Sequence, residues 1–543
     1  MSTPLTICLA QNADGSRITR PAEIGTTYWR HAIPEFLAVL EAAVEDDNVP
    51  GDVALGQVDL QGPFTSDCSH CKNDSGCLAS VEVSGVRMLR GGSGSGRELV
   101  VSPAVWSHDL RQRPLCLQLA GLTLSTLIRV AERLICSDLF LVCGQVGESF
   151  SDSEVAISVL KEAVSCLTDS APDRDLCLIF HEWTASPLFT KKFKRLFTSQ
   201  LMSDLALGES TTLLRGPAEK KKALALMTGA GRTMEGKQNR CGCLLNVGVL
   251  GLSGLGGGHL ALDLGRNRVE AYLSSGAVAA SGATAEGIST LTACKPALAL
   301  LMANLAKAVG GAGQKILLDP YLGSGGLLEP LAEIAGSPHS GFLLGSDISL
   351  TERKKLLKAA SVGPSLSDRS GVAVDRIQAS VFALPYRTTS SAWCDAILFD
   401  PPFGLRENLD SSFVQSQVHS SASSQCYIQD HSGEELLQRV SAFVGPVLEL
   451  GSTILRPGGR VVYLFPVFPS QRELGLWADP DEAGREEARL KASALPRHPC
   501  FRLYSCDVCP CRKKHAIARI VVTMERLRGQ QRKEQRELSM IQR

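Results

Sequence analysis

The second half of the chain alternates between short apolar runs and longer segments whose apolar residues recur at helical spacing. Runs of this kind are typical of buried strands, and the longer segments are typical of amphipathic helices. Strands are predicted at 315–319, 341–349, 374–380, 394–400 and 458–467, and helices at 298–309, 327–336, 350–361 and 434–455. This alternation predicts a doubly wound, Rossmann-like α/β sheet. A terminal hairpin is predicted from 502–510 and 515–526.

The first half of the chain has the pattern of a mixed α+β region. Helical spacing at 28–45 and 152–169 predicts helices, and the apolar runs 139–144 and 176–183 predict strands. Segments 90–98 and 229–243 are rich in glycine and polar residues and predict surface loops or linkers. The predicted organisation is an α+β domain, a second α+β domain, a connecting segment, the α/β domain and a charged tail, at 1–110, 111–228, 229–285, 286–526 and 527–543.

The composition gives the chain no net charge. The 543 residues include 56 basic and 56 acidic side chains, so any binding of nucleic acid must come from local patches or from a partner. No apolar run is long enough to cross a membrane, and the first residues lack the pattern of a signal peptide. We expect a soluble, cytoplasmic protein of two to four domains.

The 18 cysteines are expected to be reduced thiols in such a protein. Two clusters contain a Cys-x-x-Cys pair, but neither has the second well-spaced pair that a zinc site needs. We therefore predict no metal site. The clusters are Cys68, His70, Cys71 and Cys77, and Cys500, Cys506, Cys509, Cys511 and His515.

A glycine-rich turn follows the first strand of the α/β half. Asp319 ends this strand, and Gly323 and Gly325 let the backbone approach a ligand closely. Asp347 ends the next strand, where a carboxylate can bind both hydroxyls of a ribose. The spacing is neither that of a dinucleotide fingerprint nor that of a P-loop, which leaves a nucleoside without a pyrophosphate. Helix caps or loop acids are the alternative roles for the two aspartates.

The strand at 394–400 ends abruptly in Asp400, Pro401, Pro402 and Phe403. Two prolines in a row stiffen the turn, so the Asp400 carboxylate and the Pro401 carbonyl are expected to point in fixed directions beside an aromatic ring. Such a pair of acceptors suits a planar amino group.

Three stretches together resemble the class I S-adenosylmethionine-dependent methyltransferases that act on exocyclic amino groups: 319–325, Asp347 and 400–403. The segment 286–526 is similar to the catalytic subunit family of the tRNA guanosine-10 N2-methyltransferases. The resemblance implies that S-adenosyl-L-methionine is held by residues of the loop and of the next two strands, namely Asp319, Tyr321, Gly323, Gly325, Asp347 and Ser380.

The same resemblance implies that Asp400 and the Pro401 carbonyl bind the guanine amino group. Accepting its hydrogens would localise the nitrogen lone pair, and Asp400 would help to remove a proton. Phe403 would stack on the base, although many relatives have tyrosine there. Ser380 and Lys295 stand where the family often has acids.

The resemblance also implies two partners: tRNA and a small zinc-binding activator subunit. The predicted contact with the activator is the edge strand at 374–380, by strand addition. A THUMP-type RNA-binding domain is implied within 111–228, where Lys191, Lys192, Lys194 and Arg195 are candidate phosphate contacts or merely a solvated helix face. Two other functions stay open: methylation of another amino group, such as adenine, and RNA binding without catalysis.

Overall fold

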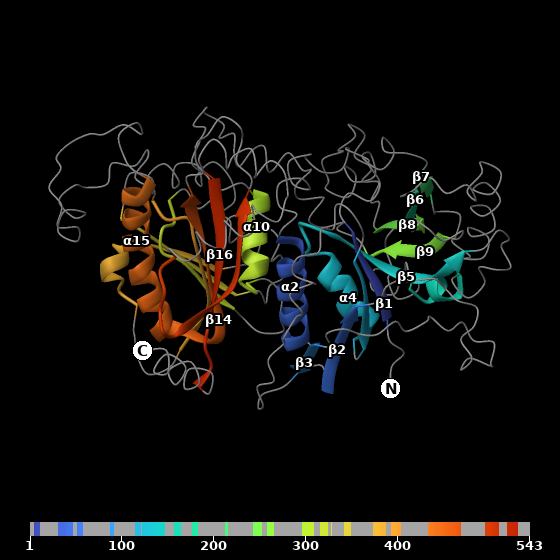
Figure 1. Ribbon diagram of the computed structural model, residues 1–543, viewed down its shortest axis with the longest axis horizontal. Coiled ribbons are helices and arrows are strands. Elements are labelled where there is room, and N and C mark those ends of the chain that lie inside the picture. The colour runs from blue at the N-terminus through green and yellow to red at the C-terminus, as the bar shows by residue number, and fades with distance from the viewer. Residues whose placement is uncertain are drawn as a thin grey trace. The chain divides into compact units, whose positions relative to one another are not determined.

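A computed structural model shows two compact units, 1–280 and 281–543, each described here by itself (Figure 1). The described residues are 5–10, 31–46, 51–57, 87–91, 115–120, 122–146, 157–163, 176–182, 212–214, 243–251, 258–264, 296–308, 315–323, 327, 341–348, 373–386, 392–402, 433–467, 495–509 and 518–529. Apart from Leu327, the predicted helices at 327–336 and 350–361 lie outside them.

The second unit is built on a seven-stranded sheet in the order β12-β11-β10-β13-β14-β16-β15. The strands are β10 (Ile316–Asp319), β11 (Phe342–Asp347), β12 (Ala373–Gln378), β13 (Cys394–Phe399), β14 (Leu455–Val467), β15 (Phe501–Cys509) and β16 (Ala518–Arg526). The first five in this order are parallel, and β16 is antiparallel to both of its neighbours. The predicted Rossmann-like sheet and its terminal hairpin are confirmed.

Helices cover both faces of this sheet: α10 (Pro296–Leu305) and α15 (Gly433–Ile454) lie on opposite sides of it (Figure 1). The described side chains of α10 are buried, which explains why its sequence is apolar on every side. The helix ends sooner than predicted, and Lys307, with φ of 55°, turns the chain just beyond it. The Lys307 carbonyl accepts a hydrogen bond of 2.9 Å from Lys315 Nζ.

The start of β14 differs from the prediction, because the strand begins at Leu455 rather than at 458. Its register against β13 shifts between the pairs Cys394–Leu455 and Ala396–Arg460, so the extra residues form an irregular, bulged start. Gly459 is required there, since a Cβ would lie 2.7 Å from the Asp395 carbonyl oxygen.

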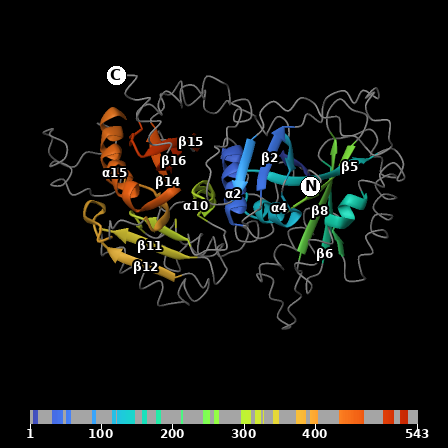
Figure 2. The same ribbon diagram turned by 90° about the horizontal axis from the view of Figure 1, so that it is seen from below.

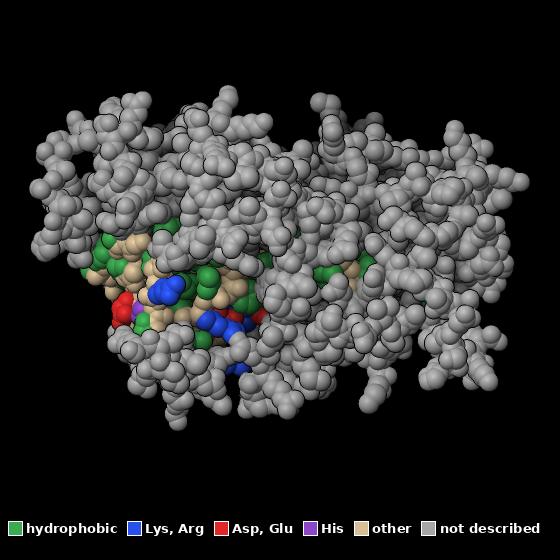
Figure 3. Space-filling view, viewed as in Figure 1, with side chains coloured by type: hydrophobic (Ala, Val, Ile, Leu, Met, Phe, Trp, Pro, Cys, Tyr) green, Lys and Arg blue, Asp and Glu red, His purple; other side chains and the backbone are tan. Residues whose placement is uncertain are grey.

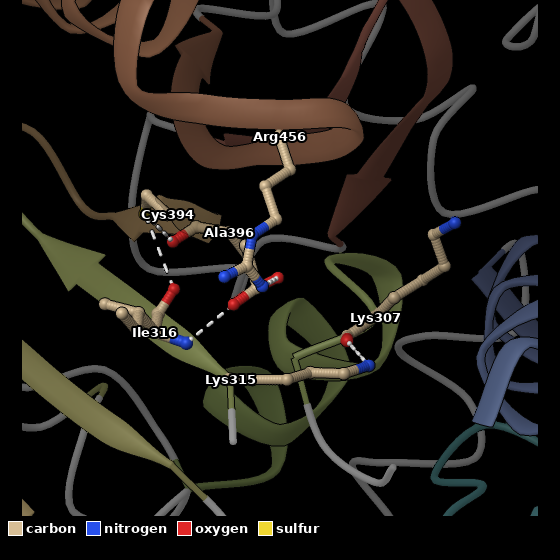
Figure 4. Close-up of polar contacts among 7 residues, drawn as sticks. Lys307, Lys315, Ile316, Cys394, Ala396 and Arg456 are labelled. Carbon is tan, nitrogen blue, oxygen red and sulfur yellow. Dashed lines mark hydrogen bonds and ion pairs between the residues drawn. The ribbon is translucent and has the colours of Figure 1, made fainter. Parts of the chain in front are cut away.

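The amino ends of β10 and β13 are fastened by one carboxylate (Figure 4). Asp395 Oδ2 accepts a hydrogen bond of 2.8 Å from the Ile316 backbone N–H, and Oδ1 pairs with Arg456 Nη1 at 2.5 Å. Cys394 Sγ donates to the Ile316 carbonyl at 3.4 Å. These contacts join the two strands at the end opposite to their carboxyl termini.

A fully buried arginine joins α10 to the last three strands. Arg460 Nη1 donates to the Leu305 carbonyl at 3.0 Å, Nη2 pairs with Glu525 at 3.1 Å, and the guanidinium lies 3.6 Å from the centre of the Tyr504 ring. Arg502 also pairs with Glu525, at 2.9 Å. Burial raises the pKa of Glu525, but the charges of Arg460, Lys307 and Arg502 outweigh it and lower the pKa to about 2.

The first unit contains a nine-stranded sheet in the order β3-β2-β4-β1-β5-β9-β8-β6-β7. The strands are β1 (Leu5–Ala10), β2 (Gly51–Gln57), β3 (Arg87–Gly91), β4 (Leu115–Ala120), β5 (Asp138–Val146), β6 (Leu176–Glu182), β7 (Thr212–Leu214), β8 (Cys243–Gly251) and β9 (Gly258–Asp263). Strands from all three predicted segments, 1–110, 111–228 and 229–285, pair in this one sheet. The boundaries predicted at 110 and 228 therefore do not coincide with breaks in it.

Two helices of this unit, α2 (Ala32–Asp46) and α4 (Leu124–Ala131), pack together. Glu35 of α2 is fully buried and accepts hydrogen bonds from the backbone N–H groups of Ile135 and Cys136, at 2.9 and 2.8 Å. A buried carboxylate needs such donors. The mixed α+β character of the first half is confirmed, and helix appears at 157–163 within the predicted 152–169.

Several other expectations concern metal, membrane and surface charge. Within the described ranges, no group of three or more His, Cys, Asp or Glu side chains could hold a metal ion, and neither Cys500 nor Cys506 forms a disulfide. None of the described helices has the length and apolar character that crossing a membrane requires. On the face shown in Figure 3, the described surface mixes apolar side chains with small groups of basic and acidic ones.

Glu525→Gln should destabilise the second unit by about 3 kcal/mol at neutral pH, because it leaves the buried Arg460 without its counter-charge. The pKa of Glu525 in the folded protein is about 2, below the ordinary 4.5. The carboxylate therefore stabilises the fold fully above pH 4.5, and this stabilisation is lost as the pH falls toward 2. Urea denaturation should show that the difference in the free energy of unfolding between wild type and the variant becomes smaller as the pH falls through this range. Glu449→Gln is the control, because Glu449 is 75% exposed in its pair with His498 and should matter little.

Candidate functional site

Three carboxylates lie where parallel strands end. Asp319 ends β10, Asp347 ends β11, and Asp400 follows β13 directly. β10 pairs with β11 on one side and with β13 on the other, and the connections run in opposite directions from this point. In open α/β sheets, ligands bind outside the carboxyl ends of the strands at such a switch point.

Asp319 is 1% exposed, and only one of its two carboxyl oxygens has a hydrogen-bond partner among the described residues. Its Oδ1 accepts a hydrogen bond of 2.9 Å from the Tyr321 backbone N–H, while its buried Oδ2 has no hydrogen-bond partner among the described residues. Burial raises the pKa of Asp319 to about 8, the Tyr321 N–H lowers it, and the charges of Asp347 and Asp400 raise it further. A positively charged donor arriving at Oδ2 would stabilise the ionised form of this carboxyl group.

The glycine turn is fastened across the end of β11. Gly323 has φ of +49°, a left-handed conformation that favours glycine, and its N–H donates to Asp347 Oδ2 at 2.8 Å. The Leu322 N–H donates to the Ser346 carbonyl at 2.8 Å. The Leu322 side chain fills the space beside Gly345. A Cβ at position 345 would lie 2.7 Å from the methyl groups of Leu322. The glycine turn is therefore held against the end of β11 by two hydrogen bonds and by the Leu322 side chain.

The hydroxyl of Tyr321, a predicted cofactor-binding residue, contacts helix α15. The hydroxyl donates to the Phe443 carbonyl of α15 at 2.9 Å, and the ring centre lies 5.6 Å from that of Phe399 and 6.1 Å from that of Phe443. Burial raises the pKa of Tyr321 well above its usual value. In this structure the hydroxyl fastens the glycine turn to α15.

Ser380 caps the short helix η3 (Val381–Ala383), which follows β12. Its Oγ accepts a hydrogen bond of 3.3 Å from the Phe382 N–H. The neighbouring Ala379 N–H donates to the Asp347 carbonyl at 3.0 Å. Ser380 is thus tied to the strand end that carries Asp347, and the oxygen assigned to ligand binding also serves as a helix cap.

The strand before Asp400 is held rigidly. Phe399 is fully buried and stacks on Tyr463 of β14, with ring centres 5.3 Å apart and planes 12° apart. Pro401 is buried, and its ring fixes the backbone φ angle there. Asp400 Oδ2 pairs with Arg519 Nη1 of β16 at 3.4 Å. No sequence pattern predicts Arg519 as a site residue, because no spacing pattern links residues so far apart in the chain.

Some predicted site residues lie outside the described residues. They are Gly325, Phe403, Lys191, Lys192, Lys194 and Arg195, together with Lys295. The other predicted site residues lie at or just after the carboxyl ends of β10, β11, β12 and β13: Asp319, Tyr321, Gly323, Asp347, Ser380, Asp400, Pro401 and Pro402.

Comparison with known proteins gives a consistent picture. The chain is 25% identical over 250 residues to the tRNA (guanine(10)-N(2))-methyltransferase TRMT11 of Xenopus laevis, covering 44% of this chain and 45% of that protein. It is also 25% identical over 257 residues to the TRMT11 protein of Homo sapiens, covering 45% and 49%. The matched region thus spans about half the length of these curated relatives. No protein-family model matches the chain.

Among solved structures, the chain is similar to TrmN from Thermus thermophilus, with 16% identity, a TM-score of 0.31 and coverage of 88% of this chain and 100% of that one. The resemblance inferred from the motifs, to the tRNA guanosine-10 N2-methyltransferases, is confirmed by the curated relatives.

Asp319→Asn should change how stability depends on pH. The wild-type fold keeps this proton up to about pH 8, whereas the unfolded chain loses it near 3.8, so wild-type stability falls as pH rises between these values. The amide of the variant does not titrate. The free energy of unfolding of the variant, taken relative to wild type, should therefore rise by at least about 1.4 kcal/mol between about pH 5 and about pH 8. Urea denaturation at both values is the measurement. Parallel curves would mean that Asp319 is ionised in the folded protein.

Proposed function

We propose that the chain transfers a methyl group from S-adenosyl-L-methionine to the exocyclic N2 amino group of guanosine 10 in tRNA. The observation that carries the proposal is Asp400, held at the rigid end of β13 beside the strand that leads into the glycine turn. The motif resemblance and the curated relatives support the choice of substrate.

The donor set fits the cofactor. S-adenosylmethionine carries a cationic amino group and supplies a methyl group on positively charged sulfur. The buried Asp319 Oδ2, which lacks a partner among the described residues, is suited to a cationic donor. We assign the ribose hydroxyls to Asp347, and the close approach to the cofactor to the backbone at Gly323 and Gly325.

The amino group of guanine is a poor nucleophile because its lone pair is delocalised into the ring. In the proposed mechanism, the Asp400 carboxylate and the Pro401 carbonyl accept its two N–H hydrogens and localise the lone pair. As the nitrogen becomes positive, Asp400 takes up one proton. Pro402 keeps the turn stiff, and Phe403 stacks on the base.

Two partners complete the proposal. We assign tRNA binding to the first unit, with a THUMP-type domain in 111–228 and phosphate contacts from Lys191, Lys192, Lys194 and Arg195. We also propose that the chain is the catalytic subunit of a cytoplasmic heterodimer with a small zinc-binding activator. β12 is suited to accept this activator, because it lies at the edge of the sheet and pairs only with β11 among the described strands (Figure 2).

Asp400→Asn should lower the rate of methyl transfer by at least about a hundredfold, because the amide cannot take up the proton. The measurement is transfer from labelled S-adenosylmethionine to unmodified tRNA transcripts by the full chain co-expressed with its candidate activator. Calorimetric binding of S-adenosylmethionine should be unchanged, which separates loss of chemistry from loss of folding. Label in a nucleoside other than 2-methylguanosine would show that the amino-group chemistry is right and the substrate wrong.

Adjacent proline substitutions test the activator contact. Successive N–H groups of a strand point to opposite sides, so one of Asp375→Pro and Arg376→Pro removes an N–H that faces β11, and the other removes one that faces outward. The outward variant should lose co-purification with the activator while keeping its thermal stability. A fully active monomer on size exclusion would argue against the heterodimer.

A further inference from the structure

Strand β13 has a carboxylate at each end, and each one pairs with an arginine. At the amino end Asp395 pairs with Arg456 at 2.5 Å, with the arginine side chain 49% exposed (Figure 4). At the carboxyl end Asp400 pairs with Arg519 at 3.4 Å, with the side chains 19% and 36% exposed. The first pair joins structural elements far from the candidate site, whereas the second pair lies in it.

The charge balance at the carboxyl end makes a cation there important. The charges of Asp347 and Asp400 both raise the pKa of Asp319, so both acids lie close enough to Asp319 to oppose its ionisation. The carboxylate that takes up the proton of an amino group must itself start ionised. A guanidinium stays charged at any pH the protein meets, so its positive charge favours the ionised form of a neighbouring acid.

The contact between Arg519 and Asp400 is a single, fairly long one. The contact joins one guanidinium nitrogen to one carboxylate oxygen, Oδ2, and it is longer than the roughly 2.7–2.9 Å of the tightest charge-assisted hydrogen bonds. Asp400 Oδ1 takes no part in this contact and is itself buried. The guanidinium therefore holds the carboxylate through one oxygen only.

The cation comes from a firmly held element. β16 lies between β14 and β15, and Arg519 is in register with Pro466 on one side and with Cys509 on the other. The residue after it, Ile520, is 1% exposed. Because both β13 and β16 flank β14, their relative placement is fixed by the sheet, and Arg519 reaches Asp400 from across a strand.

We propose that Arg519 is a positioning residue for the transfer reaction: it contacts Asp400 Oδ2, keeps that carboxylate ionised among the neighbouring acids, and fixes the orientation of the carboxylate at the end of β13. This inference rests on the proposed function. Arg519 touches neither substrate nor cofactor in this scheme, and it acts through Asp400 alone.

The test compares three variants in the methyl-transfer assay with the full chain and its candidate activator. Arg519→Met should lower kcat by about ten- to a hundredfold with little change in KM for tRNA, because the base is misplaced and less ionised. Arg519→Lys should recover part of the loss, since it restores the charge without the fork of donors. Arg456→Met removes the matching arginine at the other end of β13 and should leave kcat unchanged.

Chemical rescue separates positioning from a merely structural role. Added guanidinium ion should restore part of the activity of Arg519→Ala and have no such effect on Asp400→Asn. A kcat for Arg519→Met equal to that of wild type would overturn the inference while leaving the proposed function intact. A higher rate or a lower KM would also overturn it, because Arg519 would then be a competitor for the amino-group acceptor. Absence of transfer by the wild-type complex overturns both proposals.

Discussion

The parallel pairing of β10 with β11 and β13 is the constraint on which the site depends. It brings three acids, far apart in the chain, to one edge of the sheet. Burial raises the pKa of Asp319, and the charges of Asp347 and Asp400 raise it further, whereas Asp400 has the guanidinium of Arg519 beside it. Neighbouring carboxyl groups therefore lie in different electrostatic surroundings.

The antiparallel end of the sheet is held by a second electrostatic arrangement. Arg460 is fully buried, and its counter-ion Glu525, the Leu305 carbonyl and the Tyr504 ring surround it. A buried charge with this many partners fixes how α10, β14 and the terminal hairpin meet. Arg519 belongs to the same hairpin. The contacts of Arg460 therefore also help to position the Arg519 guanidinium near Asp400.

Local sequence patterns predicted the strands of the α/β half well, because buried parallel strands are short apolar runs with clear ends. The acids Asp319, Asp347 and Asp400 were found for the same reason, since each closes such a run. Patterns could not show that the Tyr321 hydroxyl reaches α15, that Ser380 caps a helix, or that Arg519 meets Asp400. These contacts depend on which strands become neighbours, and that information is spread over long separations in the chain.

In the first unit, β9 has a place that its sequence does not suggest. It pairs with β5 on one side and with β8 on the other, and so joins β3-β2-β4-β1-β5 to β8-β6-β7. The sheet is therefore incomplete until residues 258–263 are available, although β1 begins at Leu5. On a ribosome the two partial sheets would emerge with unpaired edges and wait for this strand. A segment that looked like a connector thus sets the moment at which the unit can fold as a whole.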